Sequence, residues 1–126
     1  MGDLVATFPS SDDLPDILHR TLVQLVRSDR PDLTTRQLAM LLVCYTTSED
    51  QTVRSLAAML GAPKPSITRS VDRLSEFDLV QRKPDPQDRR SVLVGRTAKG
   101  ATFIRELAQI MHRSVAATAA PRKLAR

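Results

Sequence analysis

The chain of 126 residues has few of the residues that build disulfide, metal and base-stacking sites. Its single cysteine, Cys44, cannot form an intrachain disulfide. Its only histidines are His19 and His112. A four-ligand zinc site would need carboxylate ligands as well, and the sequence assigns no carboxylate to that role. Aromatic residues make up 3% of the sequence and tryptophan is absent, which disfavours folds that stack single-stranded bases on aromatic rings. We expect no cofactor and no metal.

Long hydrophobic runs are also missing. The longest charge-free stretch, residues 37–48, is 12 residues long and contains Thr46, Thr47 and Ser48, whereas a membrane-spanning helix needs about 18 apolar residues. The N-terminal residues lack the basic region and cleavage site of a signal peptide. With 41% apolar and 26% charged residues, the composition is typical of one globular domain. We expect a cytoplasmic protein without membrane contact.

Patterns typical of catalysis are absent as well. The sequence has no glycine-rich phosphate loop, no His/Cys cluster and no nucleophile with an evident partner base, so we expect no enzymatic activity. Cys44 lies in the middle of an apolar helical segment, where a thiol is usually a small buried hydrophobic group with a raised pKa.

Charge is divided unevenly along the chain. Residues 1–60 carry five basic and eight acidic side chains, whereas residues 61–126 carry fourteen basic and six acidic ones. A basic half favours a polyanionic partner such as nucleic acid, although a run of charge can also be a solvated face. Composition alone leaves both interpretations open.

Apolar periodicity and end signals predict a mainly helical fold with one small β-hairpin. A capping box at Thr34 and Gln37 starts the second helix, Gly61 ends the third, and Thr97 caps the last. The expected elements are helices at about 14–28, 35–46, 53–60, 66–77 and 98–120, and strands at 79–82 and 91–94 around a turn at 84–88. This order is typical of a winged helix-turn-helix.

The fourth expected helix, which follows the connector 61–65, has the composition of a recognition helix. On its polar face, Arg69 can donate two parallel hydrogen bonds to a guanine, Ser66 and Thr68 suit bases or phosphates, and Lys64 and Arg73 suit phosphates. In the alternative interpretation, this is an ordinary surface helix whose acidic residues Asp72 and Glu76 pair with Arg69 and Arg73.

The expected hairpin is rich in cations: Arg82, Lys83, Arg89, Arg90 and Arg96. An arginine at the hairpin tip can enter the narrow, electronegative minor groove of A·T-rich DNA, and Asp88 would steer Arg89 or Arg90. Alternatively, Asp85 and Asp88 neutralise these arginines in a solvated turn.

The residues from Leu33 to Leu107 resemble the MarR family of bacterial winged-helix transcription regulators. The resemblance is carried by LTTRQLAMLL and by VRSLAAMLGAPKPSITRSVDRLSEFDLVQRKPDPQDRRSVLVGRTAKG. It implies a homodimer that binds a pseudo-palindromic duplex, with the terminal helices in the dimer interface. It also implies DNA-contacting residues on the recognition helix and in the wing.

The resemblance and the residue types together give four sets of candidate residues. The recognition helix would contribute Lys64, Pro65, Ser66, Thr68, Arg69 and Arg73. The wing would contribute Arg82, Lys83, Asp88, Arg89 and Arg90, and further candidate phosphate contacts are Thr52 and Arg54. The dimer interface would contain Leu14, Leu18, Leu22, Leu107, Ile110 and Met111.

Four departures from the family pattern bear on function. Pro63 stands where an N-cap serine is usual, Asp78 where the helix normally ends in glycine, and Arg96 where a leucine is expected. The expected C-terminal helical region is also short, and few aromatic rings are available to line a pocket, so a small-molecule effector is left unassigned.

The sequence therefore predicts a sequence-specific DNA-binding regulator of transcription, with repression favoured over activation. The two alternative functions are a protein-interaction module and a sequence-tolerant chromosome-binding protein. We expect an N-terminal segment at 1–10, a winged-helix domain at 11–120 with its DNA-binding lobe at about 33–97, and a basic tail at 121–126.

Overall fold

The computed structural model describes residues 8–120 as two compact units. One unit contains residues 31–105, and the other combines residues 8–30 with residues 106–120. Residues 1–7 of the expected N-terminal segment 1–10, and the whole expected tail 121–126, lie outside the described residues. Among residues 8–120, no helix is long and apolar enough to cross a membrane.

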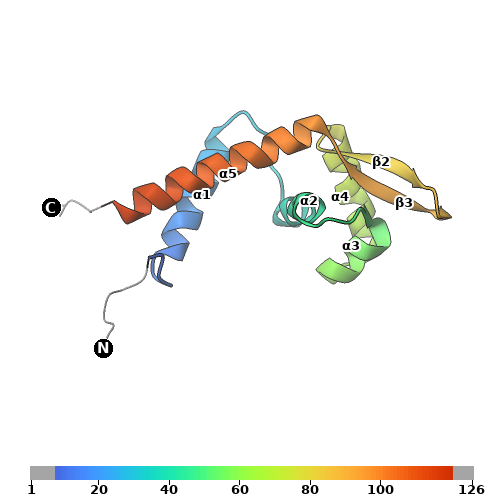
Figure 1. Ribbon diagram of the computed structural model, residues 1–126, viewed down its shortest axis with the longest axis horizontal. Coiled ribbons are helices and arrows are strands. Elements are labelled where there is room, and N and C mark those ends of the chain that lie inside the picture. Colours follow the sequence, from blue (N-terminus) through green and yellow to red (C-terminus); the bar gives the residue numbers. More distant parts are fainter. Residues whose placement is uncertain (1–7, 121–126) are drawn as a thin grey trace. The chain divides into compact units, whose positions relative to one another are not determined.

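The unit 31–105 contains three consecutive helices: α2 (Thr35–Thr46), α3 (Val53–Leu60) and α4 (Lys64–Glu76) (Figure 1). The predicted capping box is confirmed, since the Gln37 amide donates to Thr34 Oγ1 at 3.1 Å and the Thr34 amide donates to Gln37 Oε1 at 2.9 Å. Gly61 ends α3 at φ +60°, a conformation that glycine adopts without steric cost. Local end signals therefore fix the start of α2 and the end of α3.

These helices surround a hydrophobic core that fixes the orientation of α4. Its apolar positions every three or four residues are fully buried, while the opposite face carries exposed charged residues. The buried cluster consists of Met40, Leu41, Cys44, Leu56, Ile67, Val71, Leu74, Leu79, Val80, Val94 and Phe103. Burial of one face against this core leaves the other face of α4 available to a partner.

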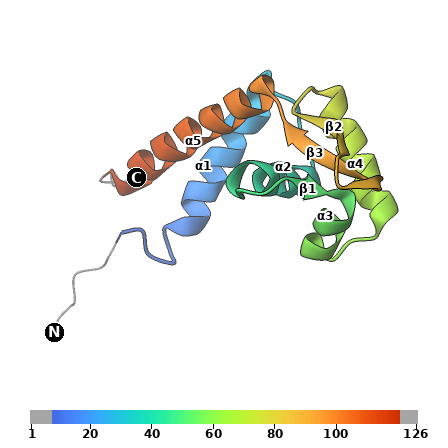
Figure 2. The same cartoon turned by 45° about the vertical axis from the view of Figure 1, so that its right-hand side comes forward.

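A three-stranded antiparallel sheet completes the unit, in the order β1–β3–β2. The predicted hairpin is present, but its strands β2 (Val80–Asp85) and β3 (Asp88–Arg96) are longer than expected and leave only Pro86 and Gln87 between them (Figures 1 and 2). The first strand, β1 (Gln51–Thr52), was not predicted, because two residues are too few for a periodic signal. It pairs with β3 and ties the start of α3 to the hairpin.

The other unit is built from α1 (Leu14–Arg27) and the C-terminal part of α5 (Ala98–Ala119). Thr118 Oγ1 lies 3.2 Å from Asp16 Oδ2, and Arg30 Nε donates to Glu106 Oε1 at 2.9 Å. These two contacts lie at opposite ends, so α1 and this part of α5 run antiparallel, side by side (Figure 2).

Candidate nucleic-acid interface

The exposed face of α4 carries the residues expected on a recognition helix. Lys64, Pro65, Arg69 and Arg73 are exposed, and Ser66 and Thr68 are half-buried. Pro63 occupies the N-cap without a side-chain hydrogen bond, as its lack of an oxygen predicts. Pro65 falls in the first helical turn, where its missing N–H costs no helical hydrogen bond. The start of α4 therefore projects a polar, cationic end into solvent.

The ion pairs of α4 agree only in part with the surface-helix interpretation. Arg73 Nη1 lies 2.9 Å from Glu76 Oε1, as that interpretation expects, and the Arg73 guanidinium lies 4.6 Å from the ring centre of Phe77. Asp72 does not pair along the helix, because its Oδ1 lies 2.5 Å from Arg82 Nη2 in the hairpin. Arg69 contacts the Ser66 hydroxyl at 3.4 Å, a long hydrogen bond that leaves its guanidinium exposed.

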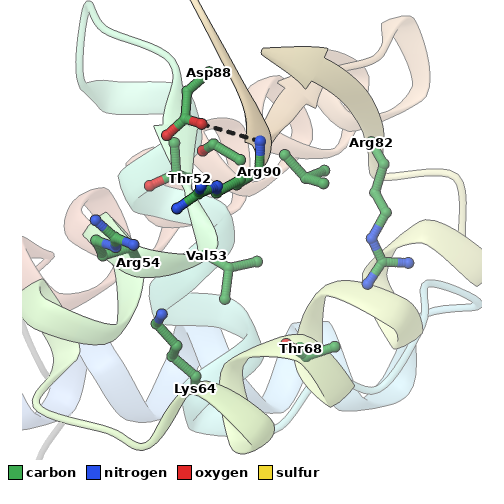
Figure 3. Close-up of a pocket in the computed structure, with 10 residues that line it drawn as sticks. Thr52, Val53, Arg54, Lys64, Thr68, Arg82, Asp88 and Arg90 are labelled. Atoms are coloured by element: carbon green, nitrogen blue, oxygen red, sulfur yellow. Dashed lines mark hydrogen bonds between the residues drawn. The ribbon is translucent and has the colours of Figure 1, made fainter.

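A groove of about 450 Å³ lies between the start of α3, the start of α4 and the hairpin. In Figure 3 the side chains of Arg54, Lys64 and Arg90 extend into this groove from three different elements. Cations from several elements around one concave surface create a positive potential suited to phosphate oxygens. The residues that line it are Thr52, Val53, Arg54, Lys64, Thr68, Arg82, Asp88, Arg90, Ser91 and Val92.

Sequence reasoning missed the uncharged part of this groove. Val53, Ser91 and Val92 line it but carry no charge, and no motif marks them. Thr52, predicted as a phosphate contact, also caps α3, since its Oγ1 accepts a hydrogen bond from the Ser55 amide at 2.9 Å. A hydroxyl that accepts one hydrogen bond still has its own hydrogen to donate to an anion.

The two neighbouring arginines of the wing differ in their surroundings. Successive residues of a strand point to opposite faces, and Arg90, unlike Arg89, lines the groove. Asp88 Oδ1 accepts a hydrogen bond from the Arg90 amide at 3.0 Å, and Asp85 Oδ1 accepts one from the Gln87 amide at 2.9 Å. Both carboxylates therefore shape the turn through backbone hydrogen bonds.

Lys83, the remaining wing residue, lies along the outer surface of the hairpin. Its side chain crosses Gly95 on the neighbouring strand so closely that a Cβ added there would lie 2.7 Å from Lys83 Cε. Because Lys83 pairs with Leu93, its side chain runs from there towards Gly95, nearer the base of the hairpin.

Comparison with known proteins accounts for this arrangement of helices and wing. The sequence model of the MarR family matches residues 29–92, about half of the chain. The chain belongs to the MarR family. It is therefore a DNA-binding transcriptional regulator, and the family membership expected from the sequence is confirmed.

Solved structures of other family members confirm the predicted winged-helix fold. Rv1404 from Mycobacterium tuberculosis is 26% identical with a TM-score of 0.69, and the match covers 85% of this chain and 69% of that one. MarR from E. coli in its apo form is 26% identical with a TM-score of 0.62, covering 86% and 79%. The S. aureus MepR–DNA complex is 22% identical with a TM-score of 0.65, covering 82% and 79%.

In this MarR-family chain the interface residues expected on the terminal helices fall into two groups, one buried within the chain and one exposed. Leu107 and Ile110 are buried within the single chain, at 5% and 2% exposure, and so offer little surface to a second copy. Leu14, Leu18 and Leu22 are 53%, 58% and 43% exposed in one row along α1, and on α5 Met111 is 46% exposed. The exposed row continues at Val26. An apolar stripe of this length is unusual on a surface that faces only water.

Cys44 behaves as the buried thiol that the sequence predicts. Burial raises its pKa to about 11, an effect opposed by the nearby Arg96 and reinforced by Asp50. Because the pKa lies above neutral pH, the thiol stays protonated there, and only the thiolate is an effective nucleophile.

We therefore expect the native protein at pH 8 to react with an aromatic disulfide reagent at least about 100-fold more slowly than the same protein in guanidinium chloride. The labelling rate should rise as the pH approaches 11. Complete labelling of the native protein within the time needed by the denatured one would contradict both the burial and the raised pKa.

Proposed function

We propose that the chain binds a pseudo-palindromic DNA duplex as a homodimer and represses transcription by occupying a promoter. Each α4 enters a major groove, and each hairpin contacts the adjoining backbone and minor groove. The observation that carries this proposal is the juxtaposition of the exposed polar face of α4 with the cationic groove beside it. A bound dimer blocks polymerase without further chemistry, which favours repression over activation.

The side chains divide into base-reading and phosphate-binding groups. Arg69 suits a guanine edge because its guanidinium is exposed and the partner of its hydrogen bond, Ser66, is neutral. Thr68 and Ser66 serve the neighbouring bases or phosphates. Arg54 and Lys64 line the groove and suit one stretch of backbone. Arg73 and Arg82 are already paired with carboxylates, so we assign them weaker phosphate contacts.

The exposed stripe on α1 supports the homodimer. Burial of apolar area stabilises association by roughly 25 cal/mol per Å² before the costs of binding, and the stripe Leu14, Leu18, Leu22 and Val26 is largely exposed in one chain. Two-fold symmetry would set the recognition helices about 34 Å apart, one turn of DNA.

Selection from a genomic DNA library at about physiological ionic strength tests the proposal, because weak phosphate-only binding is suppressed by salt. We expect an enriched inverted repeat with half-sites about one helical turn apart. Retention without a shared motif would instead indicate sequence-tolerant chromosome binding. No retention at all would indicate a protein-interaction module.

The two wing arginines give a separate prediction. Arg90 lines the groove beside Arg54 and Lys64, so Arg90→Ala should weaken binding to all duplexes about equally and lower the salt dependence by about one unit of slope. Arg89 lies on the other strand face, so Arg89→Ala should chiefly remove a preference for A·T-rich flanks. Binding titrations on duplexes that differ only in their flanks measure both effects, and each variant serves as the control for the other. A flank effect in Arg90→Ala alone would reverse the two assignments.

A further inference from the structure

The base of the wing is fixed to the end of α2 by a residue with no other assigned role. Arg96 is the last residue of β3 and pairs with Val80 at the start of β2. Its Nε donates to the Cys44 carbonyl at 2.9 Å, and its Nη2 donates to the Thr47 carbonyl at 2.5 Å. One guanidinium therefore joins the hairpin to the last turn of α2 and to its C-cap residue Thr47.

The electrostatics of α2 favour this contact. The last carbonyls of a helix have no intrahelical partners and form the negative end of its dipole. Because Arg96 is a cation, its hydrogen bonds to these carbonyls are charge-assisted and stronger than those of a neutral donor. The guanidinium also lies 5.7 Å from the ring centre of Tyr45. A planar guanidinium has its donors in fixed positions, so these hydrogen bonds constrain both the distance and the orientation of Arg96 relative to the end of α2.

Tyr45 extends the same connection to both ends of the hairpin. Its hydroxyl accepts a hydrogen bond from the Thr97 amide at 2.9 Å, directly after β3, and donates to the Leu79 carbonyl at 2.8 Å, directly before β2. Thr97 Oγ1 in turn donates to the Asp78 carbonyl at 2.7 Å. Gly100 leaves room for this arrangement, because a Cβ there would collide with the Tyr45 hydroxyl and the Leu79 carbonyl.

We propose that Arg96 is a positioning residue that sets the direction of the wing, and through it the place where Arg89 and Arg90 meet DNA. Arg90 lies six residues from Arg96 on the same strand face, about 20 Å away at the rise of a β-strand. A change of about 5° in the direction of the hairpin at its base would thus move the tip by nearly 2 Å, enough to break a hydrogen bond. This inference rests on the proposed function for its effect on DNA, but not for its effect on the wing.

The test on DNA combines Arg96→Met with removal of the wing contacts. Methionine keeps the unbranched stem and removes the guanidinium. We expect Arg96→Met to weaken binding to the selected duplex about 5- to 20-fold, and less than about 2-fold when Arg89→Ala and Arg90→Ala are already present, because coupled residues are not additive. Arg105→Met removes an exposed arginine whose Nη2 donates to Thr102 Oγ1 at 3.0 Å, and this control should change binding less than about 2-fold in either background. Equal factors for Arg96→Met in both backgrounds would overturn the proposal.

Hydrogen exchange on the free protein tests the wing itself. In Arg96→Met, the paired amides of residues 80–96 should exchange at least about 5-fold faster, while those of α4 stay within about 2-fold of the wild type. Tyr45→Phe, which removes only the hydroxyl, should have the same local effect. Faster exchange throughout residues 31–105, or no change in the hairpin, would overturn the positioning role. A wild-type protein that binds no duplex would contradict the proposed function alone, since the exchange result still decides the role of Arg96.

Discussion

Replacement of Leu18 by glutamate is expected to separate the dimer and to weaken binding to the inverted repeat by on the order of 100-fold or more. Leu18 is 58% exposed in the single chain, between Leu14 and Leu22 on α1, so a charge there leaves the core of the chain intact. In the proposed interface the same charge would be buried without a partner, which costs several kcal/mol. When a dimer has bound one half-site, its second subunit is held near the other half-site at a high effective concentration. Loss of that subunit removes this effect, which lowers the affinity by a factor of roughly 10²–10⁴.

Light scattering of the free protein and titration of the inverted repeat measure the two consequences separately. Gln24→Glu is a matched control, because Gln24 is an exposed residue of the same helix and the substitution introduces the same charge. It should leave both the mass and the affinity close to those of the wild type. A Leu18→Glu protein that keeps the mass of a dimer would remove the α1 stripe from the interface, and one that is monomeric but binds with full affinity would contradict binding as a dimer.

The parts of the fold that were predicted correctly depend on neighbouring residues in the chain. The Thr34 capping box and the left-handed Gly61 were both readable, because each uses contacts within four or five residues. The apolar face of α4 was readable for the same reason, since positions three or four apart share one side of a helix. Asp78, which departs from the usual glycine, also adopts a left-handed φ of +60°, so the backbone here follows the fold even without the preferred residue.

The features that were not predicted depend on contacts between distant residues. The strand β1 exists because Gln51 and Thr52 pair with Val94 and Leu93 of the neighbouring strand β3. In the alternative surface-helix interpretation Asp72 would pair along its own helix, but the fold places Arg82 beside it. Arg96 stands where a leucine is expected, and it binds carbonyls 49 and 52 residues earlier in the chain. No periodicity or motif encodes such pairs, because they follow from how the elements pack.

This same packing decides which arginine of α4 is available to read a base. Of the two arginines on the polar face, Arg73 is engaged by Glu76 and by the Phe77 ring, whereas Arg69 has only the Ser66 hydroxyl, at 3.4 Å, as a hydrogen-bond partner among residues 8–120. Arg69→Ala should therefore cost about 1 to 3 kcal/mol at the selected site and relax the preference for one base pair in each half-site.

Competition titrations with duplexes that carry each base pair at each position measure the cost and the change in preference together. Lys83→Ala is the informative control, because the Lys83 side chain runs along Gly95 and does not line the groove, so we expect it to act as a diffuse positive charge. It should weaken every duplex by the same small factor and leave the order of preference unchanged. If Arg69→Ala behaved in this way too, α4 would contact only the backbone, and specificity would have to come from the deformability of the DNA rather than from an arginine in the major groove.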